Sequence, residues 1–214
     1  MKRTPEQARQ TRESLLRAAL EVFDRRGVAR ASLSEIAAEA GVTRGALYWH
    51  FKSREELFDA LFQRLFSEYG LRLASDIRSG APDMLGTLRR AMLCNFERLE
   101  RDETIRKFLR IVHLKCEHTD DNAAIAALMQ RYKRMWDELM HPALTLCVRQ
   151  GALPATLDVQ AASLHLHALL LGLTHLWLLQ PGHIALQQHA ARTTDAALDA
   201  MRTSPALQRS GDAP

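Results

Sequence analysis

Residues 32–52 read SLSEIAAEAGVTRGALYWHFK, and this stretch decides the fold of the front of the chain. Ser32 and Glu35 have the spacing of a capping box, which predicts a short helix that ends near Gly41. Residues 43–50 predict a second short helix after the turn. Two short helices joined by a glycine-containing turn are the helix-turn-helix arrangement, in which the second helix enters the major groove of DNA.

The second of these helices has one face for packing and another that is free to contact a partner. At about 100° per residue, Arg44 and Trp49 share an arc that excludes Leu47. Arg44 has the reach for guanine O6 and N7 or for a phosphate, Gly45 allows close approach, and Lys52 suits a phosphate. The competing interpretation is that the aromatic residues only pack and that Lys52 is a solvated charge. The predicted DNA-binding residues are Ser32, Ser34, Thr43, Arg44, Gly45, Ala46, Tyr48, Trp49, His50 and Lys52.

The basic charge of the chain is concentrated near its start. Residues 1–54 hold eleven Lys or Arg against six Asp or Glu, whereas the rest of the chain is nearly neutral. A basic face on a small helical segment suits a polyanion, and nucleic acid is favoured over a membrane because no long basic amphipathic helix is present.

The composition favours an all-α fold. With 25% charged and 47% hydrophobic residues, the 214-residue chain is no disordered tail, and 65 Leu or Ala against 12 Val or Ile favour helix over sheet. We expect a DNA-binding domain at residues 1–53 and a ligand-binding and dimerisation domain at 54–214, linked by the helix at 54–78. About nine helices are predicted, at residues 6–26, 33–40, 43–50, 54–78, 84–100, 103–117, 122–150, 158–180 and 184–203.

Cysteine usage and the apolar segments favour a cytoplasmic protein. Cys94, Cys116 and Cys147 form no C-x-x-C pair, so neither a disulfide framework nor a zinc finger is predicted. The charged N-terminus has no apolar run behind it, so we expect no secretory signal. Residues 159–191 lack Asp, Glu, Lys and Arg, but polar residues interrupt them, which predicts helices buried against protein and no membrane span.

No enzymatic or metal site is predicted. The sequence has no glycine-rich phosphate loop and no nucleophile elbow, and the acidic residues Glu117, Asp120 and Asp121 fit the cap of the next helix. His165 and His167 are two residues apart and diverge on a helix, so no three-ligand metal spacing converges. We expect no cofactor.

The second domain has the composition of a pocket for a lipophilic molecule. Met and aromatic side chains suit varied lipophilic shapes, although they serve equally well as ordinary core residues. Polar residues on the same apolar faces need a hydrogen-bond partner, which either a cavity or a backbone carbonyl provides. The candidate ligand-binding residues are Phe62, Phe66, Met92, Asn95, Leu109, His113, Trp136, Met140, His167, Leu171 and His175.

The last two predicted helices offer apolar faces that suit a partner. A helix pair donated by each of two subunits makes a four-helix interface with two-fold symmetry. The alternative is that both faces close on their own domain and leave a monomer. We favour a homodimer because a single helix-turn-helix reads few base pairs.

Residues 33–52 resemble the DNA-binding signature of the TetR family. TRGALYWHF at 43–51 is similar to the variant in the AcrR-type multidrug-efflux repressor subgroup, and the resemblance extends thinly to Lys115-Cys116-Glu117, Leu153-Pro154 and SPAL at 204–207. Arg54 stands where many relatives have Lys, and Leu114 where they often have His. The resemblance implies a homodimer joined by its C-terminal helices, a small-molecule cavity in each subunit and release of an operator when ligand binds.

Together these features predict a ligand-responsive repressor. It is expected to bind an inverted-repeat operator as a homodimer, to be released by a lipophilic, aromatic or cationic compound, and to control a multidrug efflux operon connected with antibiotic resistance. Two alternatives stay open. One is a constitutive architectural DNA-binding protein without an effector, and the other is a regulator of the same family that controls a metabolic operon.

Overall fold

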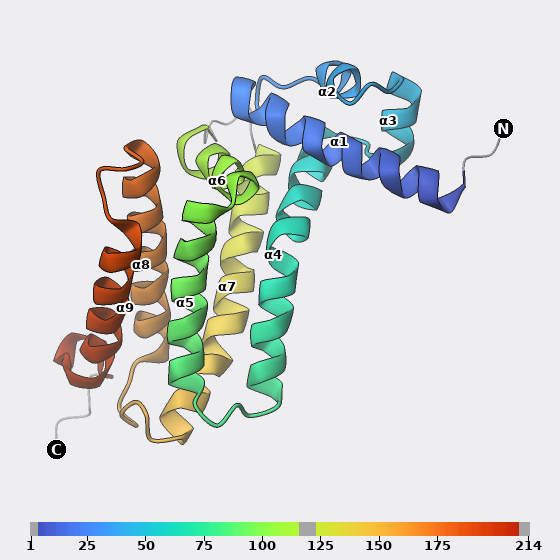
Figure 1. The fold of residues 1–214 in the computed structure, drawn as a ribbon. Helices are drawn as coiled ribbons and strands as arrows, with labels where there is room; N and C mark the ends of the chain where they lie inside the picture. The colour runs from blue at the N-terminus through green and yellow to red at the C-terminus, as the bar shows by residue number, and fades with distance from the viewer. Residues whose placement is uncertain (1–3, 116–122, 210–214) are drawn as a thin grey trace. The chain divides into compact units, whose positions relative to one another are not determined.

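The computed structural model describes residues 4–115 and 123–209, and within these ranges the regular structure is helical (Figure 1). The predicted all-α class is confirmed for the described part of the chain. The elements are α1 (Pro5–Arg26), α2 (Leu33–Glu39), α3 (Arg44–His50), α4 (Arg54–Arg78), α5 (Met84–Arg101), α6 (Glu103–Arg110), the π-helical turn η1 (Ile111–Lys115), α7 (Ala123–Arg149), α8 (Val159–Leu179), α9 (Leu186–Thr203) and the 3₁₀ turn η3 (Pro205–Leu207).

One predicted helix differs from the observed element. The pattern at residues 103–117 predicts a single helix, but α6 ends at Arg110 and continues as the π-turn η1 to Lys115. Hydrophobic periodicity does not distinguish these two helix types over so short a stretch. Glu117, Asp120 and Asp121, expected to cap the next helix, lie outside the described residues, as does Cys116.

The chain packs as two compact units. The first takes in the described parts of residues 1–67 and 103–130, and the second those of 68–102 and 131–214. The boundary between the two compact units falls inside α4, after Ser67. The physical reason is that α6 and η1 pack on α1, and that the aromatic stripe of α4 packs on Phe108 of α6.

Local capping explains where the helices of the first unit begin. The hydroxyl oxygen of Thr4 accepts the backbone N–H of Gln7, and that of Ser32 accepts the N–H of Glu35, so both caps are capping boxes. The core of this unit is aromatic and aliphatic. Its largest fully buried side chains include Leu15, Phe23, Ile36, Leu47, Phe51, Phe58 and Phe108.

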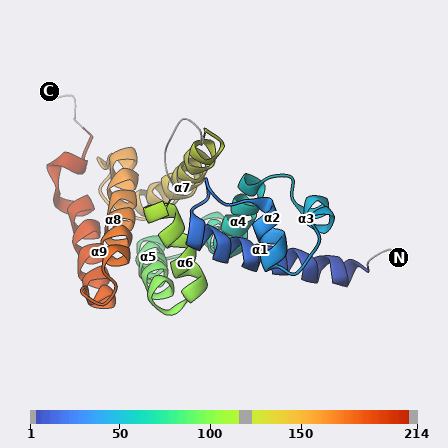
Figure 2. The ribbon, with the colours of Figure 1, turned by 90° about the horizontal axis from the view of Figure 1, so that it is seen from above.

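The second unit is a helical bundle in which α5 contacts both α8 and α9. Both views show α8 and α9 side by side (Figures 1 and 2). The guanidinium of Arg89 on α5 pairs with Asp195 on α9 at 2.5 Å. Residues after α9 return to the loop before α8, where the backbone N–H of Arg209 donates to the Thr156 carbonyl at 2.7 Å.

Candidate nucleic-acid interface and ligand site

Helix α3, the predicted recognition helix, is packed on one side and open on the other. Leu47 and Phe51 are buried in the first unit, whereas Tyr48 is 41% exposed and Trp49 is 69% exposed. Large aromatic side chains are costly to leave in water, so the exposed aromatic pair on this short helix marks a candidate binding surface. The predicted division of this helix into a packing face and an open face is therefore observed.

The other predicted DNA-binding residues surround this open face. Ser32, Ser34, Thr43, Arg44, Gly45 and Lys52 are exposed, and Ala46 and His50 are half-buried. Thr43 also has a structural role, because its hydroxyl oxygen accepts the N–H of Ala46 at 3.2 Å and caps α3. The ammonium of Lys52 donates to the Tyr48 carbonyl at 2.9 Å, which holds a positive charge at the end of α3.

Ion pairs that the sequence pattern did not predict fix α2 against the last turn of α1. Arg25 pairs with Glu39 at 2.6 Å, and Arg26 pairs with Glu35 at 3.3 Å. The hydrogen bond from Arg25 lowers the pKa of Glu39 below its usual value. The sequence signal for these contacts is the basic pair Arg25 and Arg26 at the end of the first helix, which also suits the C-terminal helix dipole.

A second charged network joins the same turn of α1 to α6 and η1. Lys107 pairs with Glu21 at 2.8 Å, and the Nε atom of Arg110 donates to Asp24 Oδ1 at 2.9 Å. Lys115 donates to the carboxylate of the same Asp24 at 3.2 Å. Burial would raise the pKa of Asp24, but the hydrogen bonds from these two cations outweigh it and hold the pKa below its usual value.

Arg54, at the start of α4, is also used inside the first unit. Its guanidinium donates to the backbone carbonyl of Ala29 and pairs with Glu55 at 2.8 Å. These contacts tie the first turn of α4 to the loop between α1 and α2. Since the side chain is committed to internal partners, it has less freedom for a phosphate than a solvated lysine has.

Four of the predicted ligand-binding residues lie in the first unit. Phe62 and Phe66 stack with ring centroids 5.2 Å apart, and Phe108 of α6 lies 6.3 Å from Phe62 and 5.8 Å from Phe66. Leu109, on α6, and His113, on η1, are half-buried. The structure thus brings the two phenylalanines together and adds Phe108, which is not among the predicted ligand-binding residues.

In the second unit the structure brings together Trp136 and His167. Their rings are stacked with centroids 4.7 Å apart and planes 14° apart. Burial lowers the pKa of His167, so its imidazole is neutral at pH 7. The Trp136 Nε1 atom is buried and has no hydrogen-bond partner among the described residues, which leaves an unused donor beside an aromatic stack.

The remaining predicted ligand residues of this unit have different surroundings. Met92 and Met140 belong to its buried core. Asn95 donates to the Ala91 carbonyl at 3.0 Å, so a backbone carbonyl is the partner that its amide needs. His175 is half-buried, and Leu171 is 43% exposed on the outer face of α8. A ligand role for these residues stays a prediction.

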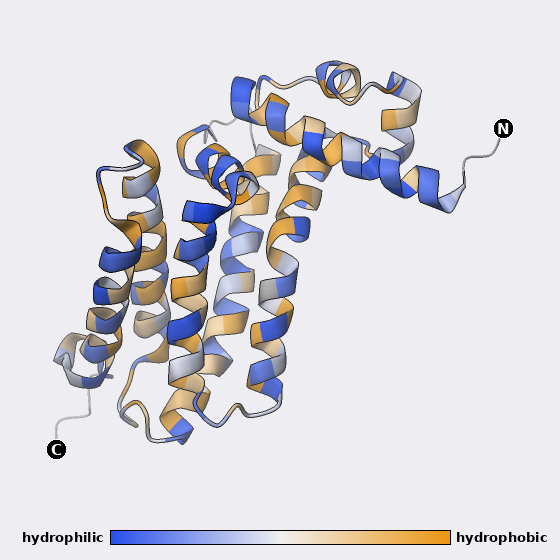
Figure 3. Cartoon of the chain, in the orientation of Figure 1, coloured by the Kyte–Doolittle hydropathy of each residue, from blue (hydrophilic) through white to orange (hydrophobic). Residues whose placement is uncertain are grey.

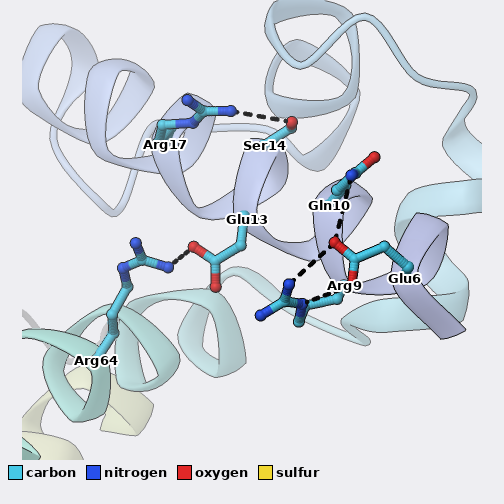
Figure 4. Close-up of a pocket in the computed structure, with 7 residues that line it drawn as sticks. All are labelled: Glu6, Arg9, Gln10, Glu13, Ser14, Arg17 and Arg64. Carbon is cyan, nitrogen blue, oxygen red and sulfur yellow. Dashed lines mark hydrogen bonds and ion pairs between the residues drawn. The ribbon is translucent and has the colours of Figure 1, made fainter.

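A charged hollow of about 620 Å³ lies between α1 and α4 in the first unit (Figure 4). Arg9 pairs with Glu6 at 2.9 Å, and Arg64 of α4 pairs with Glu13 of α1. Its lining contains none of the predicted ligand-binding residues. Because that lining is charged and polar, it does not suit a lipophilic molecule.

Helix α8 is largely apolar (Figure 3) and is buried along one face within the second unit. Its opposite face is exposed in the single chain and is therefore open to the predicted partner subunit. The helix is also long and apolar enough to cross a membrane, a test that core helices of soluble proteins pass as well. The exposed large side chains of this face are Leu164, Leu171, Leu176 and Leu179.

Comparison with known proteins extends over nearly the whole chain. Residues 15–61 match the family described as bacterial regulatory proteins, tetR family, and residues 83–203 match the C-terminal region of MAATS-type transcriptional repressors. The HTH-type transcriptional regulator TtgR of Pseudomonas putida is 38% identical over 98% of this chain and 100% of its own length. AcrR of Shigella flexneri is 30% identical over 97% of this chain and 96% of its own length.

Solved structures agree with these matches. A complex of SmeT with triclosan has a TM-score of 0.83 and 30% identity, and the alignment covers 94% of this chain and 96% of that one. SmeT is described as the repressor of the Stenotrophomonas maltophilia multidrug efflux pump SmeDEF. NalD, the secondary repressor of an efflux pump of Pseudomonas aeruginosa, has a TM-score of 0.77 and 30% identity over 93% of this chain and 99% of that one.

Proposed function

Because the chain belongs to the TetR family of bacterial regulatory proteins, we propose that it is a transcriptional repressor released from its operator by a lipophilic small molecule. The observation that carries this proposal is the open face of α3, where Tyr48 and Trp49 are exposed beside Arg44. Such a face is suited to the major groove, with Arg44 at a base edge and Lys52 at a phosphate.

The operator in this proposal is an inverted repeat read by a homodimer. The exposed apolar face of α8 supports a second copy of the chain as its occupant, because two such faces bury each other in a helical interface. With α9 beside α8, each subunit contributes a helix pair. Two α3 helices then bind half-sites about one helical turn, roughly 34 Å, apart.

The effector in this proposal is lipophilic and aromatic. The Trp136–His167 stack offers an aromatic surface with an unused N–H donor, and the Phe62–Phe66 pair offers a second aromatic surface. Triclosan, bound in the SmeT structure, is a compound of this class. Since several relatives are named as repressors of efflux pumps, we assign this chain to the control of a multidrug efflux operon in the cytoplasm.

Helix α4 provides a covalent route between effector and operator. It is one continuous helix from Arg54 to Arg78, and its first residue follows α3 through only three residues. A ligand that displaces its later turns also moves its start. To release DNA, the effector must bind the DNA-incompetent state more tightly than the DNA-competent state. A difference of about 1–3 kcal/mol between these two binding free energies changes the affinity for the operator by 5- to 150-fold.

The test begins with selection of a duplex from random DNA by the wild-type protein. We expect a palindromic sequence, termed the selected duplex, that is bound by one or two dimers and released by triclosan. Binding without sequence preference would favour the architectural alternative. Sequence-specific binding that no lipophilic compound weakens, but that a metabolite does, would favour a metabolic regulator.

A further inference from the structure

The last turn of α1 is held from two sides by opposite charges. Its acidic residues, Glu21 and Asp24, pair with α6 and η1, and its basic residues, Arg25 and Arg26, pair with α2. A change at η1 therefore reaches α2, which precedes α3, through a single helical turn. All of these contacts lie inside the first unit.

The π-turn is what places two cations on one carboxylate. Arg110 and Lys115 both donate to Asp24, whose side chain is 13% exposed, although they are five residues apart. In an α-helix residues five apart are separated by about 140° around the axis. In a π-helix hydrogen bonds join residues five apart, so such residues share a face. We call Asp24, Arg110 and Lys115 the Asp24 clasp.

Backbone contacts seat the end of η1 on the end of α1. The Lys115 ammonium also donates to the backbone carbonyl of Asp24. Gly27 ends α1 with a φ of 76°, and a Cβ atom there would lie 3.2 Å from the Lys115 carbonyl oxygen. The Asp24 clasp therefore forms where the backbones of α1 and η1 lie close together, which is possible because residue 27 is a glycine.

We propose that η1 is a two-state element that sets operator affinity: as a π-turn it closes the Asp24 clasp and holds α1 and α2 in the DNA-competent arrangement, and as an α-turn it opens the clasp. A π-turn contains one extra residue, so rewinding it to α-helix rotates Lys115 by about 100° about the helix axis and carries it away from Asp24. This inference rests on the proposed function, because Leu109 and His113, two predicted ligand residues, lie on the segment that rewinds.

The decisive experiment compares Asp24→Asn, which opens the clasp, with deletion of Leu114. The deletion removes the extra residue and leaves Lys115 four residues after Arg110, a spacing at which α-helical side chains share a face. The chain without Leu114 therefore keeps the Asp24 clasp, but its segment after Arg110 has no alternative π-helical register. Leu114 suits deletion because it is 36% exposed. Lys107→Gln is the matched control, since its pair with Glu21 precedes the π-turn and is independent of its register.

Affinity for the selected duplex is measured by fluorescence anisotropy, and thermal unfolding by circular dichroism accompanies each variant. In the otherwise wild-type chain we expect Asp24→Asn to weaken binding by about 5- to 150-fold. The Leu114-deleted chain keeps the clasp, so its affinity should change less than about threefold, as should that of Lys107→Gln, but triclosan should no longer release it from the duplex. If Asp24→Asn does not fold, Lys115→Gln takes its place.

Release of the Leu114-deleted chain by triclosan as readily as the wild type would overturn the inference, because release would then need no change of register. So would a loss from Lys107→Gln as large as that from Asp24→Asn. Failure of the wild-type protein to select any duplex is a different result, and it would reject the proposed function itself.

Discussion

The indole ring of Trp136 and the imidazole ring of His167 are stacked, with centroids 4.7 Å apart and planes 14° apart. The two residues come from α7 and α8 and are 31 positions apart in the chain. Their stack places a neutral imidazole and a buried N–H donor side by side, and we propose that it holds an aromatic ligand.

Trp136→Ala is expected to weaken binding of triclosan or of a hydrophobic dye by about 2- to 12-fold, the effect of losing one aromatic contact of about 0.5–1.5 kcal/mol. Affinity for the selected duplex without ligand should not change. Fluorescence titration measures the first and anisotropy the second. Met135→Ala is the control, because Met135 is the neighbouring residue and is 37% exposed. Equal ligand binding by wild type and Trp136→Ala would remove Trp136 from the site.

His167 is expected to make the stability of the protein depend on pH on the acidic side of neutrality. Burial lowers the pKa of its imidazole in the folded state, so the unfolded chain binds a proton more readily. The neutral imidazole therefore contributes fully to the free energy of unfolding above about pH 6.5. This contribution is lost as the pH falls towards the folded-state pKa.

The measurement for His167 is thermal unfolding between pH 8 and pH 5 for wild type and His167→Phe, which retains an aromatic ring for the stack. The melting temperature of wild type should fall more steeply on acidification than that of the variant. Parallel pH profiles would show that another group accounts for the acid sensitivity.

Arg44→Ala and Lys52→Ala are expected to affect DNA binding in different ways. A base-edge contact by Arg44 supplies about 1–3 kcal/mol of discrimination, so its loss should reduce the preference for the selected duplex over random DNA. A phosphate contact by Lys52 should weaken binding to all sequences alike and reduce the salt slope by about one. Titrations at several salt concentrations distinguish the two roles, and equal losses on both DNAs for both variants would contradict them.

Leu164→Glu and Leu176→Glu are expected to convert the dimer to a monomer. These side chains are 62% and 56% exposed on the outer face of α8, so a carboxylate there is tolerated in the free subunit but is unpaired inside an apolar interface. Sedimentation velocity measures the change. Leu71→Glu is the control, since Leu71 is 66% exposed on α4. A monomeric wild-type protein would contradict the proposed dimer, and dimers of both variants would place the interface elsewhere.

Much of the first unit could be predicted because its signals are local. The capping box of Ser32 and Glu35 and the cap of Thr43 act within one turn, and both hydrogen bonds are present. The spacing of Leu47 from Trp49 likewise predicted which one is buried. Helix periodicity and caps depend on neighbours three or four residues away, so the sequence by itself determined the helices and the open face of α3.

Only the tertiary structure decided which surfaces these helix faces contact. Asp24 and Arg110 are 86 positions apart, and no local pattern joins them or indicates that residues 111–115 form a π-turn. The same holds for α8, whose sequence is apolar around the helix: only the structure shows which face is buried in the second unit and which is exposed in the single chain. A buried contact depends on which surfaces the connecting segments bring together, and apolar composition alone does not distinguish a core from an interface between subunits.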